Sequence, residues 1–198
     1  MKTYVATGNP GKLRELKALF AKSPLRLYAY RKYAGVVEDA RSYAGNALLK
    51  ANALATALHE RGIEAAVIAD DSGLEVDALG GRPGILSARY GGDEIGWPAR
   101  RAMLLGELRG VPPFRRTARF VSVLALVEPG REPLVATGEV RGHILEGESG
   151  SGGFGYDPIF LYPPAGRSFA AMSEKEKNAV SHRCHAAEAL LAMLHERA

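Results

Sequence analysis

The sequence has few cysteines and lacks both a long apolar run and a signal peptide. Its 198 residues include one cysteine, Cys184, which excludes an internal disulfide and a metal cluster built on several cysteines. No apolar run approaches the roughly 20 residues that span a bilayer. The first residues turn polar too early for a signal peptide. We therefore expect a cytoplasmic protein without a membrane partner.

Excess charge is also small. Lysine and arginine number 26 against 22 acidic residues, a net charge of +4, and no block of five like charges occurs. This balance fits either an anionic partner or an ordinary mixed surface. A hydrophobic content of 46% with 24% charged residues is typical of globular proteins and excludes a disordered scaffold. The length predicts a single domain over residues 1–198.

Predicted strands and helices alternate along the chain, which favours an α/β fold. The hairpin-like pattern at 119–145 further predicts a mixed rather than a purely parallel sheet. We expect strands over 2–7, 65–69, 74–79, 119–127 and 134–145, and helices over 13–20, 42–60, 98–108 and from the capping box at Ser173 to the C-terminus.

The loop Thr7–Lys12 joins the first predicted strand to the first predicted helix. The N–H groups and dipole at the start of a helix attract anions. Lys12 lies at that same positive end, where a bound phosphate would offset its charge. The loop lacks the Walker A spacing, so a P-loop NTPase is not indicated. The alternative is a plain turn with a surface lysine.

Two adjacent acids, Asp70 and Asp71, follow a predicted buried strand. Consecutive residues of an extended segment point to opposite faces, so one carboxylate can face a ligand while the other braces the loop. Carboxylates suit Mg²⁺, and one could take a proton from an attacking water. The alternative is a turn in which the acids cap backbone N–H groups.

Three further patterns suit a nucleotide. The segment Gly152–Pro158 combines glycines, aromatic rings and a carboxylate, which suits stacking on and hydrogen bonding to a nucleobase; a loop packed into the core is the alternative. The basic run Lys175–Arg183 could neutralise phosphates or could be a solvated helix face. Asn46 and Lys50 lie four residues apart and share a helix face.

Together these segments resemble the inosine triphosphatase family, the pyrophosphatases of non-canonical purine nucleoside triphosphates such as dITP and XTP. The resemblance implies a long mixed β-sheet flanked by helices, in two lobes with a central cleft, and a homodimer. The segments that carry it are Thr7–Lys12, Asn46–Ala51, Ala69–Leu74, Gly84–Gly91, Gly152–Phe160 and Glu176–Arg183.

The family's site residues transfer by position. The resemblance makes Asp71 the proton acceptor and a magnesium ligand, with Glu38 as the second metal ligand. Where family members commonly have an acid before the asparagine of the second helix, this chain has Gly45. Phosphate contacts are expected from Thr7, Gly8, Asn9, Pro10, Gly11, Lys12 and Lys50, and a further substrate contact from Ser72. Contacts with the base are expected from Phe154, Gly155, Tyr156, Asp157, Lys177, His182 and Arg183.

The resemblance implies that the protein hydrolyses ITP, dITP and XTP to the monophosphate and pyrophosphate with Mg²⁺, so its partners are purine nucleoside triphosphates and not nucleic acid. A competing hypothesis is a nucleic-acid-binding module that stacks bases on Phe154 and Tyr156. The aromatic residues do not interleave with basic residues, which argues against it. A nearer alternative is a pyrophosphatase for other modified bases, such as methylated pyrimidines.

Overall fold

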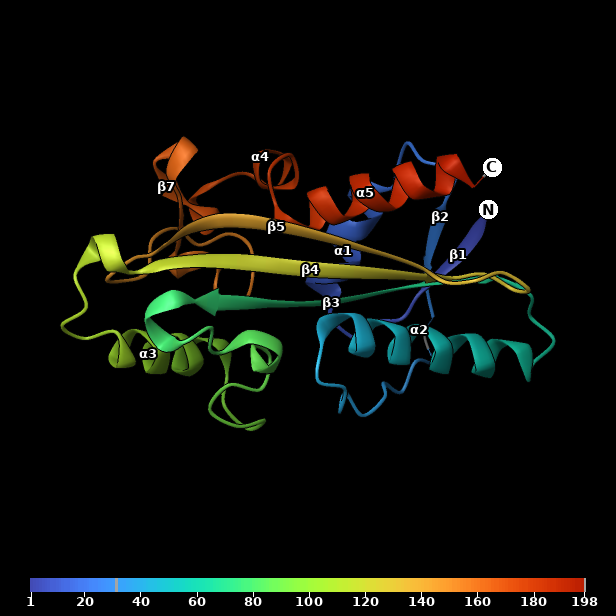
Figure 1. Ribbon diagram of the computed structural model, residues 1–198, viewed down its shortest axis with the longest axis horizontal. Helices are drawn as coiled ribbons and strands as arrows, with labels where there is room; N and C mark the ends of the chain where they lie inside the picture. The colour runs from blue at the N-terminus through green and yellow to red at the C-terminus, as the bar shows by residue number, and fades with distance from the viewer. Residues whose placement is uncertain (31, 198) are drawn as a thin grey trace. The chain divides into compact units, whose positions relative to one another are not determined.

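The computed structural model describes residues 1–30 and 32–197 (Figure 1). Over these residues seven strands form one sheet in the order β2-β1-β3-β4-β5-β6-β7. β1 runs parallel to β2 and β3, whereas β6 runs antiparallel to β5 and β7, so the sheet is mixed as expected. The strands are β1 Lys2–Val5, β2 Arg26–Ala29, β3 Ala66–Val76, β4 Thr117–Val127, β5 Leu134–Ile144, β6 Phe160–Tyr162 and β7 Arg167–Ser168.

The α-helices of the described residues are α1 Pro10–Leu19, α2 Tyr43–His59, α3 Trp97–Glu107, α4 Glu174–Asn178 and α5 His182–Glu196. Short 3₁₀ turns join several of the elements. None of the described helices is long and apolar enough to cross a membrane.

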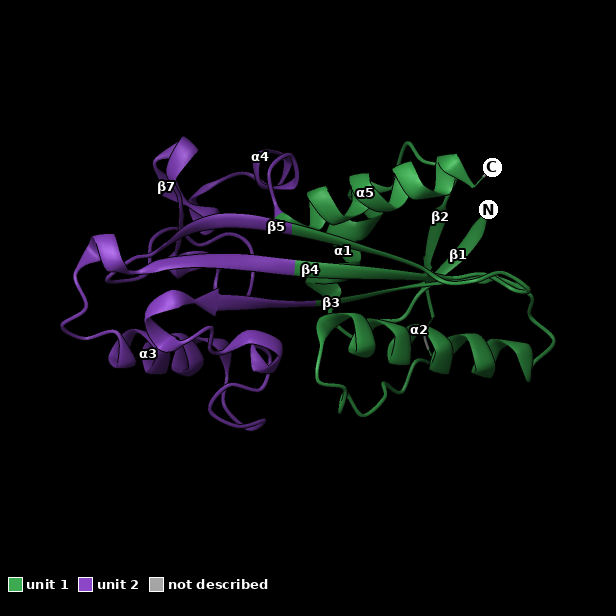
Figure 2. Ribbon diagram, viewed as in Figure 1, with its two compact units in different colours: residues 1–71, 122–138, 182–198 green, residues 72–121, 139–181 purple. Residues whose placement is uncertain are grey.

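The chain divides into two compact units, coloured in Figure 2. Unit 1 contains Met1–Asp71, Ser122–Gly138 and His182–Ala198, and unit 2 contains Ser72–Val121 and Glu139–Ser181. β3, β4 and β5 contribute residues to both units. The expectation of a single two-lobed domain with a central cleft stays a prediction.

In unit 1, helices cover both faces of the sheet: α1 and α5 lie on one face and α2 on the other (Figure 1). Ala66 and Ile68 of β3 belong to the core formed with α1 and α5. Because side chains alternate along a strand, Asp70 follows them on that face. Asp71 then faces α2. The alternation of side chains along the strand thus places the two adjacent acids on opposite faces of the sheet.

In unit 2, aromatic rings fill the core. Phe120 of β4 stacks on Phe169 with a centroid distance of 6.0 Å and lies 4.6 Å from the ring of Phe160. Leu104 and Leu108, from α3 and the residue after it, complete this cluster. Such rings bury large apolar areas, so this core stabilises unit 2.

Two expectations about the elements are wrong. We expected one strand to end at residue 69 and another to begin at residue 74, but β3 continues through Asp70 and Asp71 as one strand of 11 residues. Both carboxylates have cationic partners, which lets them remain inside a buried strand. The capping box of Ser173 with Glu176 is confirmed, but its helix ends at Asn178 and α5 begins as a separate helix.

The approach of α5 to β5 depends on Gly138. A Cβ atom there would lie 2.1 Å from the backbone nitrogen of Ala186 and 2.3 Å from the carbonyl oxygen of His182. We predict that Gly138→Ala lowers the free energy of unfolding by about 3 kcal/mol, as measured by urea denaturation.

Gly106, in α3, is the matched control, because a Cβ there meets no described atom within 4 Å. Gly106→Ala should raise stability by about 0.5–1 kcal/mol. Wild-type stability in Gly138→Ala would contradict this account of the contact between β5 and α5.

Candidate functional site

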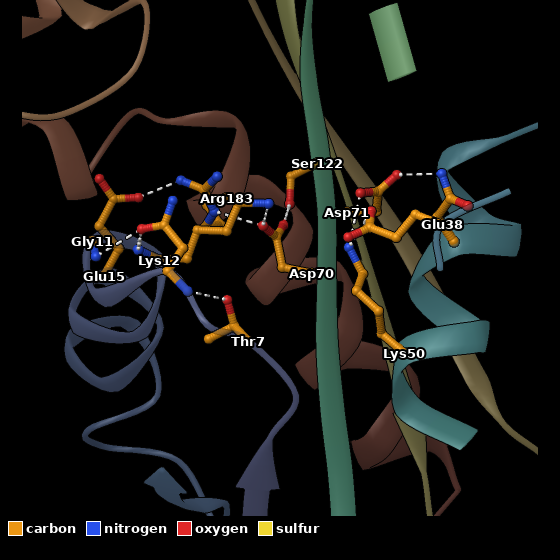
Figure 3. Close-up of polar contacts among 12 residues, drawn as sticks. Thr7, Gly11, Lys12, Glu15, Glu38, Lys50, Asp70, Asp71, Ser122 and Arg183 are labelled. Carbon is orange, nitrogen blue, oxygen red and sulfur yellow. Dashed lines mark hydrogen bonds and ion pairs between the residues drawn. The ribbon is translucent and has the colours of Figure 1, made fainter. Parts of the chain in front are cut away.

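Asp70 and Asp71 extend to opposite sides of β3, and each meets its own set of polar groups (Figure 3). Both carboxylates are buried. An isolated buried carboxylate is costly, so the groups around each acid determine what it can do.

Asp70 lies among cations supplied by α1 and α5. Its Oδ2 atom is 2.9 Å from Lys12 Nζ and 3.3 Å from Arg183 Nε, and Ser122 Oγ donates to its Oδ1 atom at 2.6 Å. Burial alone would raise the pKa of Asp70, but Arg183, Lys12 and the Ser122 hydrogen bond outweigh it and hold the pKa well below its usual range. Asp70 is therefore a permanent anion that neutralises the buried Arg183 and the partly buried Lys12.

Arg183 is almost fully buried and has a second acidic partner. Its Nη1 atom donates to Glu15, one turn along α1 from Lys12. Burial disfavours the guanidinium charge, but Asp70 and Glu15 outweigh it and raise the pKa of Arg183. Arg183 thus links α5 to both α1 and β3.

The loop between β1 and α1 is ordered by Asn9. The Asn9 side-chain oxygen accepts from the backbone N–H groups of Gly11 at 2.8 Å and Lys12 at 3.1 Å, while its own N–H donates to Thr7 Oγ1 at 3.1 Å. Asn9 is therefore the N-cap of α1, followed by Pro10 in the first turn. This cap fixes the start of α1 and therefore the position from which the Lys12 side chain projects.

Asp71 lies on the α2 side of β3. Lys50 Nζ is 2.9 Å from Asp71 Oδ1 and 3.0 Å from Glu38 Oε2, and Asn46 Nδ2 donates to Asp71 Oδ2 at 3.3 Å. Burial raises the pKa of Asp71, and the neighbouring Glu38 adds to this, although Lys50 opposes it. Asp71 therefore holds a proton more readily than an ordinary aspartate, as a general base should.

Lys50 is the cation of this cluster. Burial disfavours its ammonium charge, but Asp71 and Glu38 outweigh burial and raise the pKa of Lys50. Lys12 differs: burial lowers its pKa, and the nearby charges of Lys50 and Arg183 add to this while Asp70 opposes it. The pKa values of the two lysines thus shift in opposite directions, because Lys50 has two carboxylate partners and Lys12 has one.

The donor set around Asp71 fits a magnesium ion. Glu38 and Asp71 supply hard carboxylate oxygens, and both already approach one cation, the Lys50 ammonium. No group of three or more acidic, histidine or cysteine side chains that could hold a metal occurs among residues 1–30 and 32–197. Mg²⁺ is commonly bound by one or two carboxylates together with substrate phosphates and waters, so two carboxylates suffice.

Gly45 replaces the acid expected from the resemblance, and its position explains the difference. It is the third residue of α2, where its backbone N–H donates to the N-cap Ser42 Oγ at 3.1 Å. A Cβ atom at this position would lie 2.7 Å from the Cβ of Ala40. The glycine therefore fits the close packing of the preceding loop on the first turn of α2.

A second cluster lies in unit 2, in the loop after β5. Asp157 Oδ2 accepts from the backbone N–H of Phe154 at 2.8 Å and from Lys177 Nζ at 2.5 Å. Lys177 Nζ also lies 4.7 Å from the centroid of the Phe154 ring. The loop thereby brings together an aromatic face, a cation and a carboxylate.

Tyr156 plays a different part in the same loop. Its ring is buried edge-on against Trp97 at 5.4 Å, and its hydroxyl donates to the Ser87 carbonyl at 3.1 Å. Gly155 has positive φ and lies against Trp97, since a Cβ there would be 3.6 Å from that ring. Tyr156 and Gly155 thus shape the loop beneath Phe154.

The structure brings Lys12, Lys50, Glu38, Asp70 and Asp71 together around one strand (Figure 3). Thr7 and Gly8 lie in the loop before α1 and Pro10 is the first residue of that helix, whereas Ser72 follows Asp71 in β3 as the first residue of unit 2. His182, at the start of α5, is buried.

Two members of the Asp70 cluster were missed in the sequence. Glu15 lies three residues after Lys12, a spacing that places both on one helix face. Ser122 is a lone hydroxyl within the apolar run of β4. Both the spacing of Glu15 and the isolated hydroxyl of Ser122 are visible in the sequence, but neither pattern shows which residue it contacts.

The fold and the groups around β3 define an α/β protein with two adjacent buried carboxylates, each paired with a lysine. A model described as the Ham1 family matches residues 3–193, and the chain belongs to that family. The resemblance seen in the sequence is therefore confirmed.

Individual relatives agree over nearly the whole length. A dITP/XTP pyrophosphatase of Thermus thermophilus is 47% identical over 193 residues, 96% of this chain and 90% of that protein. That of Shouchella clausii is 46% identical over 188 residues, 94% and 92% of the two chains. The solved structure of the Staphylococcus aureus Ham1 protein matches with a TM-score of 0.85 and 37% identity, covering 100% of both chains.

The Asp70 cluster generates a stability prediction. Asp70→Asn would leave Arg183 and Lys12 buried without their shared anion, so we expect a loss of about 3–5 kcal/mol at pH 7. The pKa of Asp70 is lowered by folding, so its contribution is present above an unfolded-state pKa of about 3.9 and is lost as pH falls through the folded-state pKa. Urea denaturation at pH 7 and pH 3 should show the difference shrinking in acid.

Glu64 provides the control, because it forms an exposed pair with His59. Glu64→Gln should change stability by less than about 0.5 kcal/mol. A loss below about 1 kcal/mol in Asp70→Asn at pH 7 would show that Asp70 does not carry the cluster.

Proposed function

We propose that this chain hydrolyses the non-canonical purine nucleoside triphosphates ITP, dITP and XTP to the monophosphate and pyrophosphate. The observation that carries the proposal is Asp71, a buried carboxylate with a raised pKa beside Lys50 and Glu38. Membership of a family whose relatives are named dITP/XTP pyrophosphatases supports the choice of reaction. Removing such nucleotides would keep them out of the nucleotide pool.

In the proposed reaction, Asp71 accepts a proton from a water molecule as the water oxygen attacks the α-phosphorus. The bond between the α-phosphorus and the bridging oxygen breaks, and the electron pair leaves with pyrophosphate. Lys12 and Lys50 would stabilise charge that develops on this leaving group. Mg²⁺ bound at Asp71 and Glu38 would supply further positive charge to the phosphates.

The loop Thr7–Lys12 is proposed to hold the triphosphate, with Ser72 as an additional contact. For the base, we propose stacking on Phe154 and polar contacts from Asp157 and Lys177, supported by their mutual contacts in unit 2.

His182 and Arg183 are proposed to favour purines with an oxygen at C6. Hypoxanthine and xanthine carry an acceptor there, whereas adenine carries an amino donor. Buried donors left facing a donor disfavour the wrong base by up to about 10⁴-fold. Asp70 and Glu15 accept hydrogen bonds from Nε and Nη1 of Arg183.

The proposal further includes Mg²⁺ as the metal, a homodimer, a cytoplasmic location and no nucleic-acid partner. The family resemblance supports the first two. The single cysteine and the lack of a long apolar run support the cytoplasmic location, and aromatic residues that do not interleave with basic residues support the last.

Asp71→Asn tests the proposed base. The amide cannot take the proton from water, so kcat for ITP should fall by about 10²–10⁴-fold, while KM stays near its wild-type value. Pyrophosphate release and monophosphate formation should be measured together.

Asp39→Asn is the matched control, since Asp39 is an exposed carboxylate in the segment that carries Glu38. It should retain full turnover. Near wild-type kcat in Asp71→Asn would remove Asp71 from the mechanism, and release of orthophosphate by the wild-type protein would exclude attack at the α-phosphorus.

Phe154→Ala tests the proposed base site. Stacking depends little on base identity and contributes about 1–3 kcal/mol, so kcat/KM should fall about 10-fold for ITP, XTP, GTP and ATP alike. His182→Ala should instead reduce the ratio of kcat/KM for ITP to kcat/KM for ATP. Phe114→Ala, at a ring that is 75% exposed, is the control and should leave all four values unchanged.

A loss confined to one nucleotide in Phe154→Ala would contradict a stacking role. Equal losses on ITP and ATP in His182→Ala would contradict the proposed recognition of the C6 oxygen.

A further inference from the structure

Asn46 is a completely buried polar side chain in the first turns of α2, with a relative exposure of 0%. It lies one helical turn before Lys50, on the face directed at β3. Its amide has hydrogen-bonding groups of both kinds, and the cluster uses both.

The two ends of the Asn46 amide bind two different segments. Its Nδ2 atom donates to Asp71 Oδ2 at 3.3 Å, and its Oδ1 atom accepts from the backbone N–H of Ala40 at 3.0 Å. Ala40 lies two residues after Glu38. One side chain therefore connects β3, which carries Asp71, to the loop that carries Glu38.

The contact with Asp71 also separates the roles of its two oxygens. Lys50 Nζ lies 2.9 Å from Oδ1, whereas the Asn46 amide approaches Oδ2. A primary amide nitrogen can only donate, so it fixes Oδ2 as an acceptor and restrains rotation of the carboxylate. The base is thus oriented by a group that cannot itself exchange a proton with it.

The neighbouring residue allows this close connection. A Cβ atom at Gly45 would lie 2.7 Å from the Cβ of Ala40, so the loop after Glu38 packs directly on the first turn of α2. A larger residue at position 45 would press on the segment whose N–H group meets Asn46.

We propose that Asn46 is a positioning residue that holds the Asp71 carboxylate and the Glu38 loop in register with each other. It acts through Asp71 rather than by touching the nucleotide. The inference rests on the proposed function, because that function makes Asp71 the base.

Asn46→Asp separates the two contacts. An aspartate keeps an oxygen for the Ala40 N–H group but turns the donor at Asp71 into an acceptor, so two carboxylate oxygens would face each other. In Asn46→Ser the side chain is too short to reach both the Ala40 N–H group and the Asp71 carboxylate. Ser42→Ala is the control, because it removes the N-cap hydrogen bond to Gly45 from the same helix end without altering either contact of Asn46.

Two measurements distinguish positioning from a general structural effect. In Asn46→Asp, kcat for ITP should fall about 10–100-fold, the size typical of lost supporting contacts, with KM within about threefold of wild type. Amide hydrogen exchange of Ala40, followed by NMR in the metal-free protein, should stay slow in Asn46→Asp and become fast in Asn46→Ser. Ser42→Ala should keep both wild-type kcat and slow exchange at Ala40.

Wild-type kcat in Asn46→Asp would overturn the inference, as would fast Ala40 exchange in the wild-type protein or an equal loss of kcat in Ser42→Ala. These results differ from a failure of the proposed function. If the wild-type protein released no pyrophosphate from ITP, the reaction itself would be wrong, and with it the role assigned to Asn46.

Discussion

Two adjacent carboxylates inside one buried strand are the constraint on which unit 1 depends. Neither Asp70 nor Asp71 could remain in β3 without cations, and the alternation of the strand requires those cations on opposite faces. Lys12 and Arg183 therefore come from the helices on one face, and Lys50 from the helix on the other. The packing of three helices on this sheet is tied to the neutralisation of two neighbouring charges.

The same arrangement gives two identical side chains opposite properties. Asp70 has two cations and a hydroxyl group, which hold its pKa well below the usual range. Asp71 shares one lysine with Glu38, and burial raises its pKa. Environments that push the pKa values of paired acids apart commonly divide structural from chemical roles. Asp70 is thus suited to be a fixed counter-ion, and Asp71 is the residue that we propose exchanges a proton.

Many of the helices and strands could be predicted from local sequence patterns, and the predictions that failed have physical causes. The alternation of strands and helices and the capping box at Ser173 predicted most elements, but β6 and β7 are too short to show a period. The prediction that a strand ends at residue 69 rested on the polarity of Asp70 and Asp71. Their charges are compensated by residues distant in the sequence, such as Arg183 and Lys50. Glu15 joins that cluster through a residue far along the chain, and no local spacing reveals such a partner.

The central claim is that water attacks the α-phosphorus in a reaction that Asp71 promotes. Hydrolysis of ITP in ¹⁸O-labelled water, followed by mass spectrometry of both products, tests it most directly. The account predicts that the label enters the nucleoside monophosphate and that pyrophosphate stays unlabelled. Label in pyrophosphate would place the attack at the β-phosphorus and would contradict the mechanism.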